Sequence, residues 1–395
     1  MNTPLQLLLI DDKPQEDAFL PGDVKVIKLD PGEEGFLSKD LSESAKGCDL
    51  ILIDQDLQLN AGLSFTASDG ASLVGHFRSW ARKERQTLPP LVLVTNYDEA
   101  FAREVPSIGP PLPINGSFVG REHRLASRLD VEWLLYKPSE TTPQRILDLA
   151  RANREAIVAT GTDGLSLAEI MQFLAYPSTT AWSDRVSAAL RSARPPVSEE
   201  TPGTQIEKSP ARESTVPSGP ALLIRWLLHE ALPFPGLFLS DLYAAWTLGV
   251  TPESFAALAT KESDTDWTRE LQRARYNGPL AAFATRRWWT PGLNELSWRV
   301  RQAAEETGDL QKAFDQLAGE GELHPSPIRD AVVVWSDDLV EEDVAPIDEA
   351  VQIHLPGWPA EAFEPWMKRT EVAKDEVMAS FVDAADLPLL PGNLL

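Results

Sequence analysis

The sequence has few of the residues that build disulfides and transition-metal sites. Its 395 residues include one cysteine, Cys48, and five histidines. A single cysteine excludes an intramolecular disulfide and a multi-cysteine zinc site, and it fits a reducing cytoplasm. The histidines are scattered, and His229, His324 and His354 have no companions at the spacing of metal ligands. We interpret them as surface or core residues.

Long hydrophobic runs are also missing. The apolar stretch 5–10 is too short for a secretory signal and runs directly into two aspartates. The stretch 221–239 is interrupted by charged residues and two prolines, so it is too short to cross a bilayer. We therefore expect a soluble, cytoplasmic protein that does not bind membranes.

Positive charge is scarce as well. The chain carries 36 Lys and Arg against 60 Asp and Glu, a net charge of −24, which disfavours general adhesion to nucleic acid or anionic lipid. Apolar residues are plentiful, at 43%, with 12 Trp and 14 Phe, so the chain has ample material for a core. Its length favours two or three domains.

The first 160 residues alternate short apolar runs with helical segments. The runs that we interpret as strands are 5–10, 24–29, 49–53, 91–94 and 131–136. Near-continuous apolar strands that alternate with helices are typical of a parallel sheet covered on both faces. We therefore predict an α/β domain with a doubly wound sheet of five parallel strands, and helices at 69–85 and 143–158.

The remaining chain changes composition abruptly. A segment rich in Pro, Ser and Glu has almost no large apolar residue, so burial cannot offset the entropy of ordering it, and we interpret it as a linker. Downstream, helix-period apolar residues and two strands, 331–335 and 350–355, predict a Trp-rich, mainly helical α+β domain of unassigned function. The predicted organisation is a domain over 1–160, a helical extension over 161–192, a linker over 193–220 and the last domain over 221–395.

Polar residues follow the predicted strands where each strand ends. These residues are Asp11, Asp12, Asp54, Thr95 and Lys137. Ligands of doubly wound sheets bind at the carboxyl ends of the strands. Carboxylates brought together repel one another, and a hard cation such as Mg²⁺ relieves that repulsion. An aspartate beside the cation is a nucleophile toward phosphorus, and a hydroxyl and an ammonium would contact the phosphoryl oxygens.

In this order, the sequences LLLIDD, LILID, LVLVT and LLYKP resemble the receiver domain of two-component response regulators. The resemblance covers residues 1 to about 160 and implies a flavodoxin-like fold. It implies that Asp54 is the phosphoacceptor and that Thr95 and Lys137 contact the phosphoryl group. Asp12 and Asp54 would be direct Mg²⁺ ligands, Asp11 an outer ligand through water, and Asp56 a ligand through its carbonyl. By the same resemblance, the Lys137–Pro138 bond would be cis.

The chain departs from the family pattern in several places. Two spacings are longer than usual, because of extra residues in QLNAGLSFTAS and in VPSIGPPLPINGSFVG. Leu134 stands where family members usually have an aromatic residue, and Asn96 stands where they have a small one. Asp69 and Gly70, by contrast, match the family's turn into the third helix. The long spacings and the residues at positions 134 and 96 leave a second interpretation open, a non-phosphorylated pseudo-receiver that serves as a scaffold or adaptor.

A third interpretation is an enzyme. Asp54-Gln55-Asp56 after an apolar strand resembles the D-x-D motif of haloacid-dehalogenase-like phosphatases, with Asp54 as nucleophile and Asp56 as general acid. That family usually has Thr or Val where Gln58 stands, and its D-x-D strand usually comes first. The acidic pair on a preceding strand favours the receiver order instead.

The last domain offers two charged regions. Residues 269–301 hold seven arginines and have a local charge of +5, with Trp288, Trp289 and Trp298 interleaved. This composition would suit a nucleic-acid or nucleotide site, but Trp at helical spacing is usually core, and we favour that structural interpretation. Residues 331–395 have a local charge of −11 and would rest against the arginines or form a solvated face.

Our leading prediction is a bacterial signalling protein. A histidine kinase or phosphotransfer protein would phosphorylate Asp54 in the presence of Mg²⁺, and this would control an output domain or an output protein partner. Long receivers with unusual carboxyl domains also occur in phosphorelays of bacterial defence loci, which is a weaker analogy.

Overall fold

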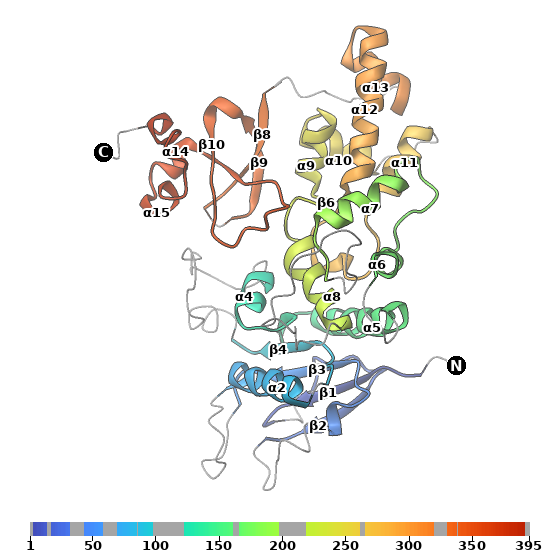
Figure 1. Cartoon of the computed structure of the whole chain (residues 1–395), viewed down its shortest axis with the longest axis vertical. Coiled ribbons are helices and arrows are strands. Elements are labelled where there is room, and N and C mark those ends of the chain that lie inside the picture. Colours follow the sequence, from blue (N-terminus) through green and yellow to red (C-terminus); the bar gives the residue numbers. More distant parts are fainter. Residues whose placement is uncertain are drawn as a thin grey trace, which may run out of the picture. The chain divides into compact units, whose positions relative to one another are not determined.

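The computed structural model in Figure 1 contains two compact units. The residues that it describes are 3–13, 17–31, 43–57, 69–84, 86–97, 122–160, 166–196, 219–260, 265–319, 330–337 and 339–391. The first unit comprises the described residues up to Ala175 and those of Pro195–Pro233. The second unit comprises Tyr176–Arg194 and the described residues of Phe234–Leu395.

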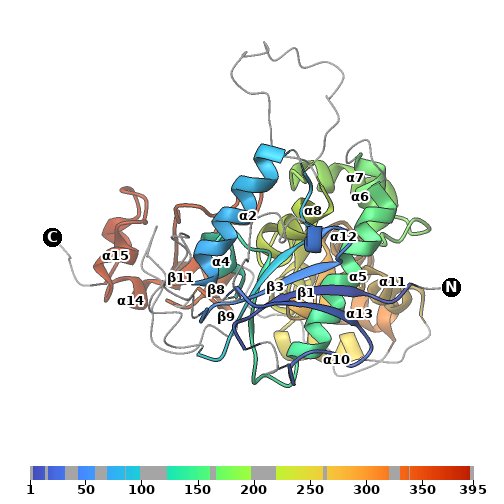
Figure 2. The same ribbon diagram turned by 90° about the horizontal axis from the view of Figure 1, so that it is seen from below.

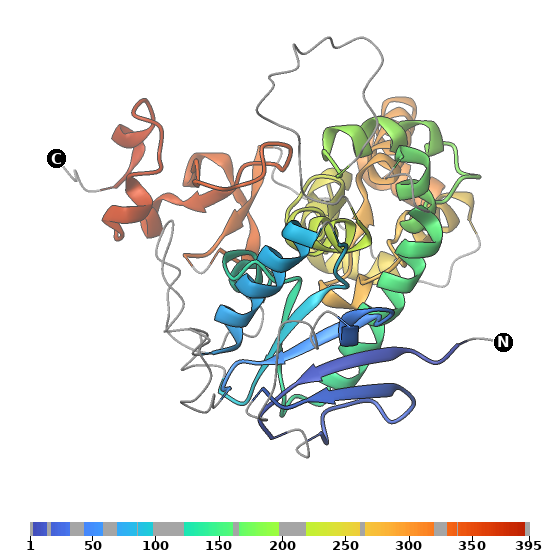
Figure 3. The same cartoon turned by 60° about the horizontal axis from the view of Figure 1, so that its bottom comes forward.

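The first unit is built on a sheet of five parallel strands, which Figure 3 shows side by side in blue to teal. The strands are β1 (Gln6–Ile10), β2 (Lys25–Leu29), β3 (Leu50–Asp54), β4 (Leu91–Thr95) and β5 (Trp133–Tyr136). Their order is β2-β1-β3-β4-β5. The predicted parallel α/β sheet is confirmed, and its strand order is consistent with a flavodoxin-like arrangement.

The order of this sheet reverses between β1 and β3, which lie next to each other in Figure 2. From β1 the chain goes outward to β2 on one side, and β3 begins the run toward the opposite edge. In doubly wound sheets, ligands bind at the carboxyl ends of the strands that flank such a reversal. The acidic residues predicted from the sequence follow or end these two strands.

Helices cover both faces of the sheet. Leu8, Ile10 and Ile53 on one face share a buried cluster with Leu73 of α2 (Gly70–Glu84) and with Leu125 of α4 (Glu122–Arg128). Side chains alternate across a strand, so Leu7 and Leu9 point to the other face. On that side α5 (Thr142–Thr160) contacts β3. Burial on both faces explains why β1, β3 and β4 are almost wholly apolar.

Residues 220–233 belong to the first unit, whereas we predicted that the carboxyl domain begins at 221. Helix α8 (Pro220–Trp226) packs against α5, and the π-helical turn η1 (Leu227–Ala231) packs against α4. A buried carboxylate holds this segment in place, because Arg225 Nη2 donates to Glu132 Oε1 at 2.8 Å. The preceding residues 197–218, which are most of the predicted linker, lie outside the described part of the chain.

The predicted helical extension is divided between the units. Helix α6 (Leu167–Phe173) lies in the first unit and packs against α5, and α7 (Ser183–Ser192) lies in the second. Ser166 and Glu169 form a reciprocal capping box that begins α6.

The second unit contains helices, a two-stranded antiparallel sheet and a four-stranded mixed sheet of order β10-β11-β8-β9. Its helices of eight or more residues are α7, α9 (Asp241–Leu248), α10 (Pro252–Thr260), α11 (Asp266–Ala274), α12 (Thr290–Thr307) and α13 (Leu310–Ala318). Its strands are β6 (Phe238–Leu239), β7 (Trp288–Trp289), β8 (Ala331–Trp335), β9 (Glu341–Pro346), β10 (Ala350–Gln352) and β11 (Trp366–Lys368). The prediction of helices with strands is confirmed here, although β9 and β11 were not predicted.

Tryptophan supplies much of the core of the second unit. Trp182, Trp267, Trp288 and Trp289 are almost fully buried. Gly292 allows α12 to approach Trp182, because a Cβ at Gly292 would lie 3.1 Å from that ring and 2.7 Å from the side chain of Ala274. In the part of the chain that the structure describes, no helix combines the length and apolar character needed to span a membrane.

Candidate functional site

The carboxyl ends of β1 and β3 bring three aspartates together. Carboxylate oxygens of Asp11, Asp12 and Asp54 lie within 4.8 Å of one another. Asp11 and Asp54 are buried and Asp12 is half-buried. Asp11 and Asp12 follow β1, and Asp54 is the last residue of β3. Parallel strands end at the same edge of a sheet, and this geometry places the three carboxylates in one cluster.

Lys137, the first residue after β5, reaches into this cluster. Its Nζ donates to Asp11 Oδ2 at 2.9 Å and lies 3.1 Å from Asp54 Oδ1. The contact with Asp54 is an ion pair without hydrogen-bond geometry, so Asp54 Oδ1 is buried with no hydrogen-bond partner among the described residues. Asp11 is held further by the backbone N–H of Lys13, which donates to its Oδ1 at 2.7 Å.

Burial governs the electrostatics of the cluster. It raises the pKa of Asp54 to about 6, against the opposing charge of Lys137, and the neighbouring carboxylate of Asp11 adds to the rise. Burial alone would lower the pKa of Lys137, but the carboxylates of Asp54 and Asp11 outweigh it and hold this pKa above its ordinary value. Lys137 therefore stays a cation.

The cluster suits a hard divalent cation. Three carboxylates and one ammonium leave an excess of negative charge. Oxygen ligands of this kind are preferred by Mg²⁺, Mn²⁺ and Ca²⁺. Asp54 Oδ1, which is buried without a hydrogen-bond partner, is an oxygen ligand that such a cation could bind. The chemistry of the residues thus fits a metal ion, without deciding which one.

Asp56 and Thr95 lie beside one another at the same edge. Thr95, the last residue of β4, is buried, and its Oγ1 lies 3.5 Å from Asp56 Oδ2 at the limit of hydrogen bonding. The backbone N–H of Tyr97 donates to Thr95 Oγ1 at 3.1 Å. Asp56 itself is exposed. Thr95 ends β4 and Asp56 lies two positions after the end of β3, as the sequence indicates. The roles of both residues stay predictions.

The start of α2 packs directly on the backbone of Asp54. A Cβ at Gly70 would lie 2.2 Å from the Asp54 carbonyl oxygen, so only glycine fits there. The Gly70 N–H donates to the Gln55 carbonyl at 3.0 Å, and the Gln55 side chain accepts from Ala71 N at 3.2 Å. Asp69 caps the helix through Ser72 N at 2.7 Å. These bonds fix the end of β3, and with it Asp54.

One expectation taken from the resemblance is wrong. The Lys137–Pro138 peptide bond is trans, whereas we predicted a cis bond. The Lys137 N–H already donates to the Thr95 carbonyl at 2.9 Å, which continues the sheet pairing and places Lys137 without a cis bond. The longer segments between Asp54, Thr95 and Lys137 lie mainly outside the described residues.

Phe19 is a neighbour of the site that no sequence motif revealed. It lies in the turn of the connection from β1 to β2, where a ring centroid is 5.4 Å from Lys137 Nζ. Its side chain is buried. An isolated Phe in a short loop resembles an ordinary core residue, and only the folded connection shows that it covers a charged group.

The arginine-rich region of the second unit is mainly structural. Arg286 pairs with Asp241 through both its Nε, at 3.0 Å, and its Nη2, and the same carboxylate accepts from Trp288 Nε1 at 2.6 Å. Arg299 pairs with Glu295 at 3.2 Å. The acidic carboxyl-terminal region meets this segment, because Glu341 Oε1 lies 4.0 Å from Arg287 Nη1. These pairs favour the structural interpretation of the arginines.

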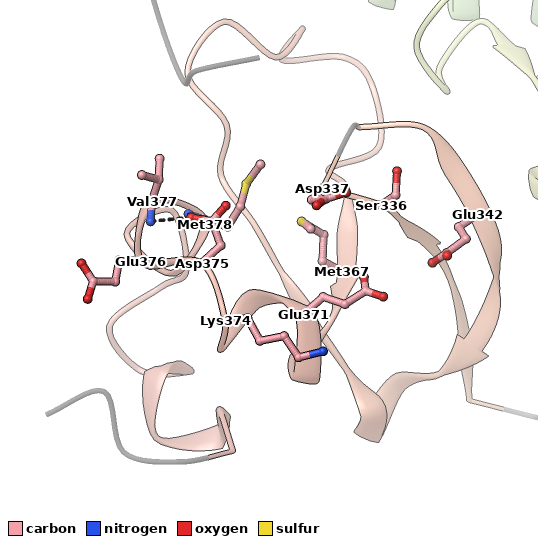
Figure 4. A pocket seen from close by; sticks show the side chains of 10 residues that line it. All are labelled: Ser336, Asp337, Glu342, Met367, Glu371, Lys374, Asp375, Glu376, Val377 and Met378. Carbon is pink, nitrogen blue, oxygen red and sulfur yellow. Dashed lines mark hydrogen bonds between the residues drawn. The ribbon is translucent and has the colours of Figure 1, made fainter. Parts of the chain in front are cut away.

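Figure 4 shows a pocket within the second unit. It has a volume of about 520 Å³. Its lining residues are Ser336, Asp337, Glu342, Met367, Glu371, Lys374, Asp375, Glu376, Val377 and Met378. Two of its acids already have partners, since Glu342 pairs with Lys368 at 3.1 Å and Asp375 caps α15 (Glu376–Ala379) through Val377 N and Met378 N. Glu342 and Asp375 therefore have structural roles.

His229 is a core residue, as the sequence suggested. Its Nε2 lies 3.0 Å from the carbonyl oxygen of Glu132, and burial lowers its pKa to about 4. The neutral imidazole therefore donates this hydrogen bond.

Comparisons with known proteins do not assign the chain to a family. No protein-family model matches it, and no curated protein is significantly similar to it. The interpretation of the site rests on its own residues and their geometry.

Proposed function

We propose that the first unit is a receiver-like phosphoacceptor, with Asp54 as the residue that takes up the phosphoryl group. The observation that carries the proposal is the position of Lys137, whose Nζ lies 2.9 Å from Asp11 and 3.1 Å from Asp54 in an otherwise acidic cluster. In this arrangement the Asp54 carboxylate can act as the nucleophile, and the adjacent lysine supplies a fixed positive charge for the phosphoryl oxygens.

The transfer needs an ionised Asp54. With its pKa raised to about 6, this carboxyl is mostly ionised at neutral pH. One Asp54 oxygen would attack phosphorus as the bond from phosphorus to the donor's leaving group breaks, and an acyl phosphate results. Lys137 would contact a phosphoryl oxygen, and Thr95 Oγ1 would donate a hydrogen bond to another.

Asp12 and Asp54 would hold the divalent cation directly and Asp11 would support it, with Mg²⁺ as the proposed ion. When bound, the cation would neutralise charge on the carboxylates and on the phosphoryl oxygens. Asp11 is held by Lys13 N and Lys137 on its two oxygens, which suits a supporting role more than a direct one.

In the cell, the donor would be a histidine kinase or a phosphotransfer protein, and the second unit or an output protein would respond. A phosphorylated state controls a partner only if the two states differ in affinity for it. The proposed class is therefore a cytoplasmic signalling protein of bacterial two-component type.

Intact-mass spectrometry tests the proposal. The protein is incubated with Mg²⁺ and acetyl phosphate, alongside Asp54→Asn and a control, Asp23→Asn, which removes an exposed carboxylate of the β1–β2 connection. We expect one added phosphoryl group in the wild type and the control and none in Asp54→Asn.

The same assay separates the alternatives. A wild type that gains no mass with acetyl phosphate, other small donors and a cognate kinase would favour the non-phosphorylated scaffold. Continuous release of phosphate from small phosphomonoesters, lost in both Asp54→Asn and Asp56→Asn, would favour the phosphatase.

A further inference from the structure

The connection between β1 and β2 places an aromatic ring over the Lys137 ammonium in the acidic cluster. The Phe19 ring centroid is 5.4 Å from Lys137 Nζ, within the range of cation–π attraction. Phe19 is 7% exposed and the Lys137 side chain is also 7% exposed. Two of the directions around the ammonium are taken by Asp11 and Asp54, and the ring occupies a further one.

The turn that carries Phe19 is anchored to the sheet. Leu20 N donates to the Asp17 carbonyl at 2.9 Å, and Asp17 pairs with Lys28 of β2 at 2.6 Å. The turn closed around Phe19 and the pair that ties Asp17 to β2 limit the conformations open to this segment, so less entropy is lost in holding the ring against Lys137.

The ring's position matters for water. An acyl phosphate is lost when a water oxygen attacks phosphorus and the bond between phosphorus and the Asp54 oxygen breaks, which returns the carboxylate and releases inorganic phosphate. A phosphoryl group on Asp54 would lie against Lys137, and therefore next to the apolar ring that covers Lys137. An apolar group there excludes water from that side of the group and strengthens its pairing with the ammonium.

We infer that Phe19 is a positioning residue that shields Lys137 from water and keeps it against Asp54, and that it thereby sets how long a phosphoryl group persists on Asp54. The effect on the persistence of the phosphoryl group rests on the proposed function. The shielding of Lys137 applies whether or not Asp54 is phosphorylated.

The shielding is tested first, without phosphorylation. Wild type, Phe19→Ala and Phe19→Leu are treated with limiting acetic anhydride, and acetylation of Lys137 is followed by peptide mass spectrometry relative to the exposed Lys83. We expect Lys137 to react about tenfold faster in Phe19→Ala, which corresponds to about 1.4 kcal/mol. Phe19→Leu should stay within about twofold of the wild type, because leucine keeps most of the apolar cover.

The second measurement follows loss of phosphate. The three proteins are phosphorylated with acetyl phosphate, the donor is removed, and the decay of the phosphorylated mass is recorded. We expect the half-life to fall about tenfold in Phe19→Ala and little in Phe19→Leu. Lys28→Gln, which frees the anchored turn at the exposed Asp17 pair, should shorten it to a smaller extent.

The outcomes distinguish the two levels of the inference. Equal Lys137 acetylation in wild type and Phe19→Ala would overturn the shielding, and equal half-lives would overturn its role in phosphate loss. Faster acetylation in a protein that never gains a phosphoryl group would support the shielding and contradict the proposed function. If Phe19→Ala does not fold, Phe19→Val, which keeps a branched apolar side chain, takes its place in both assays.

Discussion

The buried His229 should make the first unit less stable in mild acid. Its imidazole donates to the Glu132 carbonyl at 3.0 Å, and burial lowers its pKa from the ordinary value of 6.5 to about 4. The charges around it partly cancel, because Arg225 lowers this pKa and Glu132 and Asp130 raise it. Burial therefore decides the direction.

The sign and size of the effect follow from linkage. The unfolded chain takes up a proton on His229 near pH 6.5, whereas the folded unit resists this until about pH 4. The neutral His229 thus contributes stability that is fully present above the unfolded pKa and is lost as the pH falls toward the folded one. The full difference is about 3 kcal/mol, of which about 2 kcal/mol is lost by about pH 5.

The assay compares variants across this pH range. Urea unfolding of the full chain is followed by hydrogen exchange in peptides from β1 to β5, so that the signal reports on the first unit. His229→Gln keeps an N–H donor for Glu132 but does not titrate, and His354→Gln removes an exposed histidine of the second unit as a matched control. Asp54 also titrates here, but it is present in every variant, so the difference between variants isolates His229.

We expect the wild type and His354→Gln to lose about 2 kcal/mol more than His229→Gln between about pH 7.5 and pH 5. A His229→Gln variant with the same pH slope as the wild type would refute the assignment of a neutral, buried imidazole.

Three other predictions concern the same unit. Glu132→Ala should destabilise it by about 3 kcal/mol in urea unfolding, because Arg78 and Arg225 lose a buried partner and Leu91 N an acceptor; a change under about 1 kcal/mol would contradict this. Gly70→Ala should weaken Mg²⁺ binding in isothermal titration calorimetry about tenfold or more, since its Cβ would collide with the Asp54 carbonyl; unchanged affinity would show that the end of β3 does not position the metal ligands. EDTA should abolish the mass gain with acetyl phosphate and excess Mg²⁺ should restore it; a gain that persists in EDTA would exclude the cation from the reaction.

The strands of the first unit and their polar ends were predictable because their signals are local. Apolar runs such as Leu50–Ile53 are recognisable in any context, and parallel pairing then places Asp11, Asp54 and Lys137 at one edge. The start of α10 at Thr251 carries a local signal of the same kind, because threonine favours the capping position and its Oγ1 accepts from Ser254 N at 3.2 Å.

Long-range pairings left no comparable signal. Arg225 and Glu132 are 93 positions apart, so nothing near either residue indicates that α8 returns to the first unit. A composition boundary at the Pro-rich segment suggested that the following helix begins a new domain, whereas a buried ion pair attaches it to the first unit. The strands β9 and β11 were missed for a related reason, since β11 is short and β9 carries four polar or proline residues on an edge of its sheet.

The sequence by itself determined the five strands, the acidic residues at their ends and the excess of negative charge, because each depends on residue type and short-range order. Only the tertiary structure decided that Asp54 Oδ1 is buried 3.1 Å from Lys137, that Phe19 covers that lysine, and that His229 is neutral in the core. These properties depend on what surrounds a group in space, and burial, not sequence spacing, sets the strength of a charge's interactions.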